Sequence, residues 1–307
     1  MANKLWEKDF EVNSEIERFT VGRDRELDLY LAKYDVLGSM AHITMLESIG
    51  LIGKDELPLL LKELKHIYAI CERGEFRIEE GIEDVHSQVE LMLTRKLGDM
   101  GKKIHSGRSR NDQVLVDLKL FTRHELMEVA EAVKVLFDEL QQKSEQYKDV
   151  LMPGYTHLQV AMPSSFGLWF GAYAESLCDD MLFLQAAYKM TNRNPLGSAA
   201  GYGSSFPLNR QMTTDLLGFD SMDYNVVYAR WDAARRNAML ALPWQPFQAR
   251  WQSWLSMPAC LTHRTSALSN CQRNARRGRA SCRIRRTPMS SNSSVPSVTS
   301  CRRYHSR

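Results

Sequence analysis

Apolar residues recur at helical spacing through most of this chain. Between Asp24 and Ser48 they fall three or four positions apart, and Gly50 follows as a stop signal. The positions are Leu27, Leu31, Tyr34, Leu37, Ala41 and Met45. A second helix is predicted from about Leu57 to Glu72, where Gly74 ends it.

The longest repeat predicts a helix of about 39 residues, or about 58 Å at about 1.5 Å per residue. Asn111 to Asp149 contains no Gly or Pro. Its apolar stripe recurs every three or four residues at Leu126, Val129, Val133, Leu136 and Leu140. Pro153 and Gly154 end it. Pro163 suits the first turn of another long helix through Met190, which is apolar on more than one face and therefore needs several neighbours.

Alternating β patterns are scarce, so we predict an all-α fold. Two helices far longer than the usual 11 or so residues indicate an elongated helical bundle, and their excess apolar surface indicates burial in an oligomer. The predicted domains are an N-terminal helical domain, the long central bundle helices and an irregular tail. Their bounds are residues 1–105, 106–242 and 243–307.

Composition changes sharply at Pro243. The residues from there to Arg307 hold 12 Arg, 12 Ser and 4 of the 6 Cys, and no Lys, Asp or Glu. The first 242 residues carry 28 Lys and Arg against 37 Asp and Glu, a balance typical of a soluble metabolic enzyme. No run is apolar enough to cross a membrane and no signal peptide opens the chain, so we expect a cytoplasmic protein with no membrane partner.

The tail admits three interpretations: an Arg/Ser-rich arm that binds nucleic acid, a cysteine metal site, or a segment whose sequence was never selected to fold. Its cysteines form no C-x-x-C pair, so we predict no metal. Nucleic-acid binding would need an affinity that falls steeply with salt, and we expect none.

Polar residues gather in HSGRSRNDQ, His105 to Gln113, directly before the long helix. Guanidinium groups, hydroxyls, an amide and free helix N–H groups together could bind carboxylates. The candidates are Ser106, Arg108, Ser109, Arg110 and Asn111. An ordinary capped helix start with solvated arginines explains the same pattern.

Three further segments carry candidate chemistry. PGYTHLQVAMP places Thr156 and His157 between two prolines, where a histidine could move protons, although lone histidines are usually structural. EDVHSQVE contains His86, a further candidate; a histidine on a helix face that meets a carboxylate is the simpler interpretation. NPLGSAAGYGSSFPLNR is a Gly/Ser-rich loop without the pattern of a phosphate-binding loop.

This chain resembles the argininosuccinate lyases of the fumarase/aspartase superfamily over about residues 1–230. Four segments carry the resemblance: SGRSRNDQ, GYTHLQ, EDVHSQVE and NPLGSAAGYGSSFPLNR. The resemblance implies β-elimination of argininosuccinate to arginine and fumarate, without metal or organic cofactor. It implies that His157 belongs to the acid/base machinery. It implies that Thr156, Asn111 and the Ser106 to Arg110 loop bind substrate, in a homotetramer whose active sites each combine three subunits.

The family's mobile loop, which resembles G-S-S-x-M-P-x-K-K-N-P and supplies a catalytic serine, is missing from this sequence. The tail instead contains GRASCRIRRTPM, Gly278 to Met289. Codons for G-S-S-I-M-P-H-K-K-N-P-D, chosen within their degeneracy and read one base later, spell this string at every position. We therefore expect that the tail is lyase sequence read out of frame from near Pro243, that it does not pack, and that this chain is an incomplete bundle without activity.

Other functions remain open. Adenylosuccinate lyase, fumarase and aspartase share the bundle, although SGRSRNDQ argues against them. A non-catalytic structural bundle descended from the same enzymes could keep every motif. A panel of substrates would separate these alternatives.

Overall fold

The computed structural model describes residues 22–157 and 159–231. All of them lie in the first of two compact units, residues 1–250. The expectations for the tail, from an irregular fold to an out-of-frame origin, fall on residues 243–307, which lie outside the described part of the chain. The predicted division at residue 105 stays a prediction.

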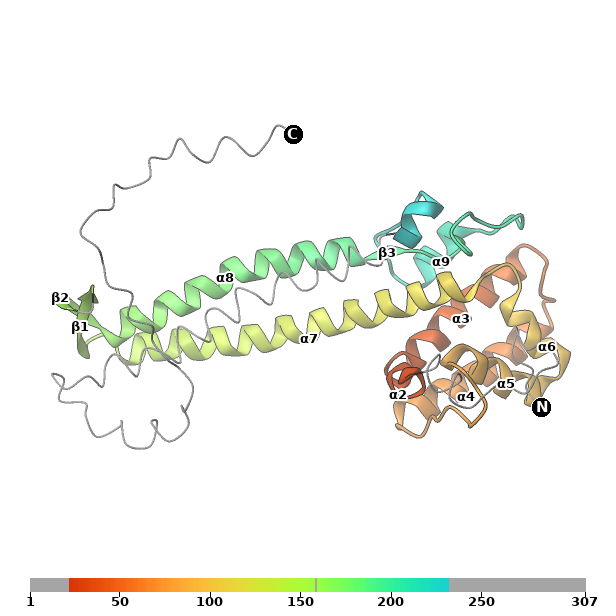
Figure 1. Cartoon of the computed structure of the whole chain (residues 1–307), viewed down its shortest axis with the longest axis horizontal. Helices are drawn as coiled ribbons and strands as arrows, with labels where there is room; N and C mark the ends of the chain where they lie inside the picture. The colour runs from red at the N-terminus through yellow and green to blue at the C-terminus, as the bar shows by residue number, and fades with distance from the viewer. Residues whose placement is uncertain (1–21, 158, 232–307) are drawn as a thin grey trace. The chain divides into compact units, whose positions relative to one another are not determined.

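Helices make up most of the described structure (Figure 1). In chain order they are α2 Asp24–Leu27, the 3-10 helix η1 Asp28–Tyr30, α3 Ala32–Ser48, α4 Glu56–Glu72, α5 Val85–Leu97, α6 Asp99–Lys102, the 3-10 helix η2 Lys103–His105, α7 Arg110–Gln146, α8 Phe166–Thr191 and α9 Arg210–Leu216. The predicted helices over Leu57 to Glu72 and Asn111 to Asp149 correspond to α4 and α7.

The single helix predicted over Asp24 to Ser48 is wrong in its first turns. The chain there forms α2 and η1, and α3 begins only at Ala32. No residue of α2 or η1 is buried, and Leu27 and Tyr30 are 51% and 67% exposed. Short helical segments gain most of their stability from packing, so this stretch breaks where it has no core to pack against.

The predicted helix start at Pro163 is also wrong. Residues Leu151–Thr156 and Gln159–Ser165 form an antiparallel hairpin, β1 and β2, in which Pro163 lies opposite Pro153. Prolines are tolerated because both strands of a two-stranded sheet are edge strands. Helix α8 begins after the hairpin, with the Ser165 hydroxyl accepting a hydrogen bond from the Leu168 N–H at 3.1 Å. A second sheet pairs β3 Arg193–Asn194 with β4 Ser221–Met222 in parallel.

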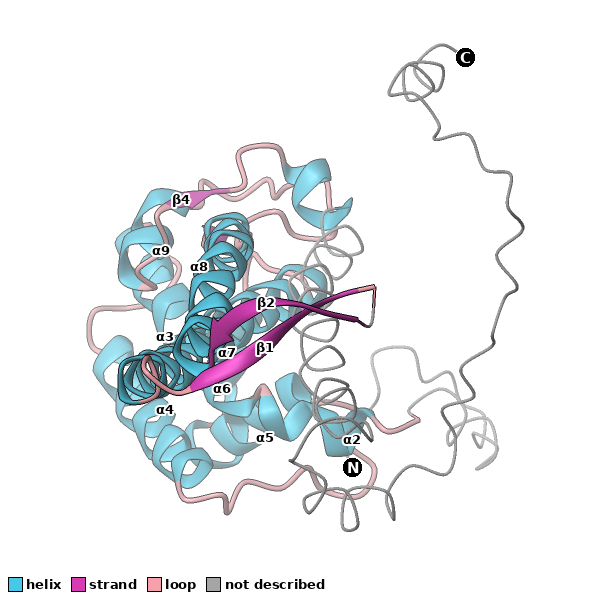
Figure 2. Cartoon of the chain, turned by 90° about the vertical axis from the view of Figure 1, so that its left-hand side faces the viewer, coloured by secondary structure: helices cyan, strands magenta, loops and turns pink. Residues whose placement is uncertain are grey.

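Apolar packing organises the described chain in three regions. One joins Tyr34 of α3 to Val116 and Leu120 of α7. Of the remaining two, the larger joins α3, α4 and α5 around buried residues such as Ile43, Leu64 and Leu93. The other joins α7 to α8, which run side by side in Figure 1 and are seen end-on in Figure 2. The N-terminal helices thus share one core, and the two long helices bury their own apolar faces against each other.

The apolar stripe predicted along α7 is only partly confirmed. Leu126, Val133 and Leu140 are buried, and they pack against residues of α8. Leu136 belongs to the same stripe but is 37% exposed. A single α8 neighbour therefore covers only part of the apolar face of α7.

The second long helix keeps apolar side chains on its exposed faces, as its sequence indicates. Leu168, Leu182 and Phe183 of α8 are 69%, 66% and 55% exposed in the single chain. None of the helices in the described part of the chain is both long and apolar enough to cross a membrane.

Candidate functional site

Two helix N-termini are capped by side chains next to the predicted carboxylate-binding loop. Asp84 precedes α5, and its Oδ1 accepts a hydrogen bond from the Ser87 N–H at 2.8 Å. Ser109 precedes α7, and its hydroxyl accepts from the Asn111 N–H at 3.3 Å while Asp112 accepts from the Ser109 N–H at 2.9 Å. This reciprocal capping box explains why α7 starts at Arg110.

Arg110 links these two helix starts. Its Nη1 donates to Asp84 Oδ2 at 2.8 Å, and its Nη2 donates to Ser87 Oγ at 2.8 Å. The side chain of Arg110 is 29% exposed, so its guanidinium remains within reach of solvent. Helix N-termini carry partial positive charge, and the Arg110 guanidinium adds a full one, which Asp84 and, at 3.5 Å, Glu83 offset in part. This arrangement can bind a carboxylate.

Arg108 does not share that exposed position. It is 8% exposed, and its Nη2 donates to the Ser39 hydroxyl at 3.0 Å. Burial lowers the pKa of Arg108 despite the carboxylates around it. In the single chain, the Arg108 guanidinium is therefore buried, unlike that of Arg110, and its contact with a substrate carboxylate stays a prediction.

The buried His42 holds the backbone of the loop His105 to Gln113. Its Nε2 lies 2.8 Å from the Ser106 carbonyl oxygen, so this nitrogen carries the hydrogen and donates. Burial, with the positive charge of Arg108 nearby, lowers the pKa of His42 to about 3. A neutral imidazole thus holds the backbone of Ser106 in place.

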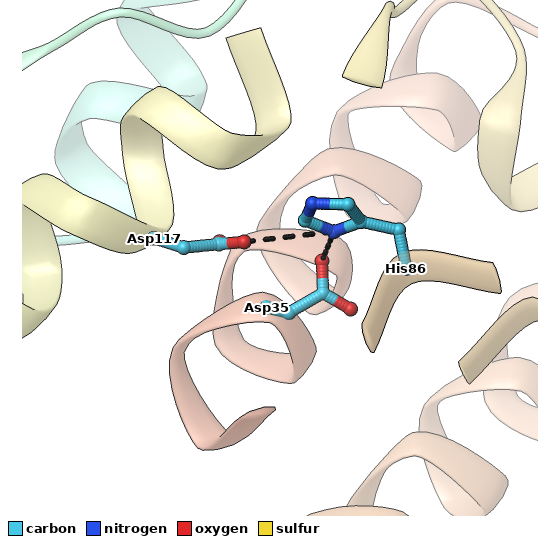
Figure 3. Close-up of side chains that lie close together, drawn as sticks. All are labelled: Asp35, His86 and Asp117. Atoms are coloured by element: carbon cyan, nitrogen blue, oxygen red, sulfur yellow. Dashed lines mark hydrogen bonds and ion pairs between the residues drawn. The ribbon is translucent and has the colours of Figure 1, made fainter. Parts of the chain in front are cut away.

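His86 meets two buried carboxylates (Figure 3). Its Nδ1 lies 2.8 Å from Asp35 Oδ1 of α3 and 3.6 Å from Asp117 Oδ2 of α7. His86 is 5% exposed, and both aspartates are fully buried. The structure thus places His86 on a helix against two aspartates, and its role at a substrate stays a prediction.

Asp35, His86 and Asp117 offer ligand atoms that all lie within 4.8 Å of one another, a spacing that a metal ion could use. The buried Arg108 guanidinium is close enough to act on both carboxylates. Asp35 Oδ1 already accepts from His86 and from the Gln113 amide at 2.5 Å. A cation would have to displace these donors beside a buried positive charge, so the donor set suits a metal poorly.

The Gly/Ser-rich loop is tied to the start of α7. Asp112 Oδ2 accepts hydrogen bonds from the backbone N–H groups of Gly197 and Ala199, each at 3.0 Å. Ala199 has a positive φ of 50°, a conformation that costs free energy outside glycine. Its hydrogen bond to a buried carboxylate offsets that cost and fixes the loop beside HSGRSRNDQ.

Thr156 and His157 lie away from this group. Thr156 is the last residue of β1 and His157 follows it in the turn, both are exposed, and His157 has a φ of 50°. The hairpin follows the C-terminal end of α7, whereas Arg110 begins that helix (Figure 1). Helix α7 has 37 residues, and such a helix spans about 55 Å. One chain therefore does not bring His157 and Arg110 into one site.

A comparison with known protein families matches residues 12–237 to the family described as lyase. The chain belongs to this lyase family. Argininosuccinate lyase of Bacteroides fragilis strain YCH46 is 78% identical over 244 residues, which are 79% of this chain and 55% of that protein. Argininosuccinate lyase of Parabacteroides distasonis is 71% identical over 261 residues, 85% of this chain and 58% of that protein. This lyase-family chain thus spans a little over half the length of these curated relatives.

Solved structures of lyases share the fold. An EDDS lyase variant with bound fumarate has a TM-score of 0.68 and 26% identity, over 83% of this chain and 50% of that one. A fumarate lyase:delta crystallin from Brucella melitensis bound to cobalt has a TM-score of 0.68 and 14% identity, over 84% and 62%. The predicted family and the predicted incomplete helical bundle of the fumarase/aspartase type are confirmed.

Sequence reasoning missed the buried residues that contact the lyase motifs. Asp35, His42 and Asp117 lie within apolar helical repeats, and Asp112 has the sequence position of an ordinary helix-capping residue. A charged residue on the core face of a helix is the signal that could have found them, because buried charges require partners.

Proposed function

We propose that this chain carries the carboxylate-binding part of an argininosuccinate lyase, which cleaves argininosuccinate to L-arginine and fumarate by β-elimination. The observation that carries the proposal is Arg110, held by Asp84 and Ser87 between two helix N-termini in a chain 71 to 78% identical to argininosuccinate lyases. The reaction needs no metal or organic cofactor.

The chemistry fits these side chains. A base removes the proton beside a carboxylate, and the resulting dianionic centre needs cationic and N–H donors around it. Arg110, Asn111 and the N–H groups at the start of α7 supply such donors. An acid then protonates the departing guanidino nitrogen, and His157 is proposed to take part in this proton transfer. Thr156, Ser109 and Ser106 are proposed to complete the substrate contacts.

The distance between His157 and Arg110 supports an assembly of several chains. Because α7 separates them by about 55 Å, a complete site requires the hairpin of one copy beside the helix start of another. The exposed apolar side chains of α8 are available for such packing. We propose a cytoplasmic homotetramer for the intact enzyme, with argininosuccinate as its substrate and with neither nucleic acid nor membrane as partner.

We also propose that this chain by itself is inactive. It lacks a G-S-S-x-M-P-x-K-K-N-P string. It contains instead GRASCRIRRTPM, which is what codons for that motif spell when they are read one base later. The test is fumarate release from argininosuccinate by the purified chain, followed by ultraviolet absorbance. We expect no release above background, and release after one base is restored near the codon for Pro243. Activity of the unrepaired chain would contradict the inactivity, and a repaired chain active only on another substrate would contradict the argininosuccinate assignment.

Fumarate binding tests the carboxylate site separately from turnover. Arg110→Gln removes the guanidinium, and we expect fumarate affinity, measured by calorimetry, to fall about 10-fold or more, as expected for a charge-assisted hydrogen bond. Arg95→Gln on the exposed side of α5 makes the same charge change as a control. Equal losses in both variants would show that Arg110 has no specific role.

A further inference from the structure

The hydrogen bonds around His86 determine which ring nitrogen carries its proton. Asp35 Oδ1 accepts from the Gln113 Nε2 amide at 2.5 Å and lies 2.8 Å from His86 Nδ1. An oxygen that accepts from an amide and belongs to an ionised carboxylate has no proton to offer. The hydrogen between Asp35 and His86 must then belong to Nδ1.

The pKa values of the two aspartates beside His86 shift in opposite directions. Burial alone raises the pKa of Asp35, but His86, Arg108 and Gln113 outweigh it and hold that pKa below its usual value. Burial and the neighbouring negative charge of Asp35 raise the pKa of Asp117 well above its usual value. Of the two, Asp35 is therefore the group that the surroundings favour as an ionised carboxylate, whereas they disfavour the charge on Asp117.

We propose that Asp35 is a positioning residue that keeps the proton of His86 on Nδ1, so that Nε2 is the atom through which His86 exchanges a proton with a ligand bound between the starts of α5 and α7. The proposal rests on the proposed function of that site. In the exchange, the Nε2 lone pair takes up a proton from the ligand, and the resulting imidazolium lies against the Asp35 carboxylate. The reverse step returns the same proton from Nε2.

The placement of His86 supports this direction of transfer. Figure 3 shows the second ring nitrogen on the side of the ring away from Asp35. No hydrogen bond joins Nε2 to a described residue. His86 occupies the first turn of α5 between Asp84 and Ser87, the two residues that hold Arg110. An aspartate that orients a histidine through Nδ1 while Nε2 does the chemistry is a recurrent arrangement in enzymes.

The charged groups around the ring come from several elements. Asp28 of η1 and Asp35 of α3 act on it from one side, and Asp117 of α7 acts from another. His105 of η2 and the buried Arg108 supply the neighbouring basic groups. The buried Arg108 guanidinium acts on both Asp35 and Asp117, and this positive charge disfavours a divalent cation at the same place.

Nitrogen-15 NMR of the ring nitrogens of the full chain tests the inference. We expect His86 to show a protonated Nδ1 and an unprotonated Nε2 at neutral pH, with its signals identified by their loss in His86→Gln. A ring protonated on Nε2 alone would overturn the proposal without any variant. Addition of zinc should leave these signals in place, and a zinc-induced shift of both nitrogens would replace the proposal with a metal site.

Variants separate positioning from general folding. Asp35→Asn keeps an oxygen acceptor and should retain the Nδ1 proton, whereas Asp35→Ala should lose it. Asp117→Asn keeps the size of a side chain whose oxygen lies 3.6 Å from His86 Nδ1, and it should leave the Nδ1 proton in place. If Asp35→Ala does not fold, Asp35→Asn can be compared with Asp117→Ala instead. A loss of the Nδ1 proton in Asp117→Ala would assign the positioning role to Asp117 and would overturn the proposal.

Fumarate distinguishes this inference from the proposed function. When fumarate binds, the backbone amides of Arg110 and Asn111 should shift, and the His86 Nε2 signal should shift with them. If the amides shift while Nε2 does not, the site binds a dicarboxylate but the proton-exchange role of His86 is wrong. If neither shifts while Nδ1 is protonated, the positioning by Asp35 holds and the proposed carboxylate site fails.

Discussion

The carboxylate of Asp112 accepts a hydrogen bond from the backbone N–H of Ala199, a residue 87 positions later in the chain. The same side chain caps α7 through the Ser109 N–H and also accepts from Gly197. One buried carboxylate therefore joins the two loops that carry the candidate chemistry, and its removal should affect both.

We predict that Asp112→Asn destabilises the chain by about 1–3 kcal/mol, since an amide would place N–H donors against backbone N–H groups that need an acceptor. Urea denaturation measures the change, and hydrogen exchange at Gly197 and Ala199 should become faster. Asp138→Asn, an exposed change on the same helix, is the control. A variant as stable as that control would contradict the role of Asp112.

A buried ion pair holds α7 to the strand β4 region. Lys119 Nζ donates to Asp223 Oδ2 and, at 2.9 Å, to the Arg193 carbonyl, and Lys119 is fully buried. We predict that Lys119→Met costs about 3–5 kcal/mol because it leaves Asp223 buried without its partner. The double variant with Asp223→Leu should recover part of this loss in denaturation experiments, and Lys134→Met on the exposed face of α7 should cost little. Equal costs for Lys119→Met and Lys134→Met would contradict the prediction.

Close approach of α7 and α8 depends on Gly167. A Cβ at this position would lie 2.5 Å from both the Ser144 carbonyl oxygen and the Lys148 Cα, which are backbone atoms that cannot move aside. Gly167→Ala should therefore cost about 1–3 kcal/mol through overpacking. At Gly171, one helical turn later, a Cβ meets only the Ser144 hydroxyl at 3.2 Å, so Gly171→Ala should be tolerated. The thermal midpoints of the two variants provide the comparison.

Neutral His42 should make stability depend on pH. Its pKa falls from about 6.5 when unfolded to about 3 in the folded chain. The unfolded chain binds the extra proton between these values, so His42 lowers stability as pH falls below about 6.5, by up to about 1.4 kcal/mol per pH unit. His42→Gln should remove this contribution from the difference in unfolding free energy between pH 7 and pH 5, while the exposed His66→Gln should not. An unchanged difference in His42→Gln would contradict it.

Apolar periodicity located some helices of this chain correctly and others incorrectly. Periodicity located α4 and α7 because their apolar faces bury against neighbours along the same stretch of chain. It failed at Asp24 to Tyr30, whose apolar side chains have no core to join, and at Pro163, because a hairpin with two edge strands accepts prolines that suggest a helix start.

The sequence by itself determined the helical class, the family and the motifs, since these depend on local spacing and on residue types that stand together. Only the tertiary structure decided that Arg108 is buried while Arg110 is accessible, that Asp35 and Asp117 meet His86, and that one chain separates His157 from Arg110. Those facts depend on which helix faces pack together and on the length of α7. They arise from contacts between residues far apart in sequence, which no local pattern encodes.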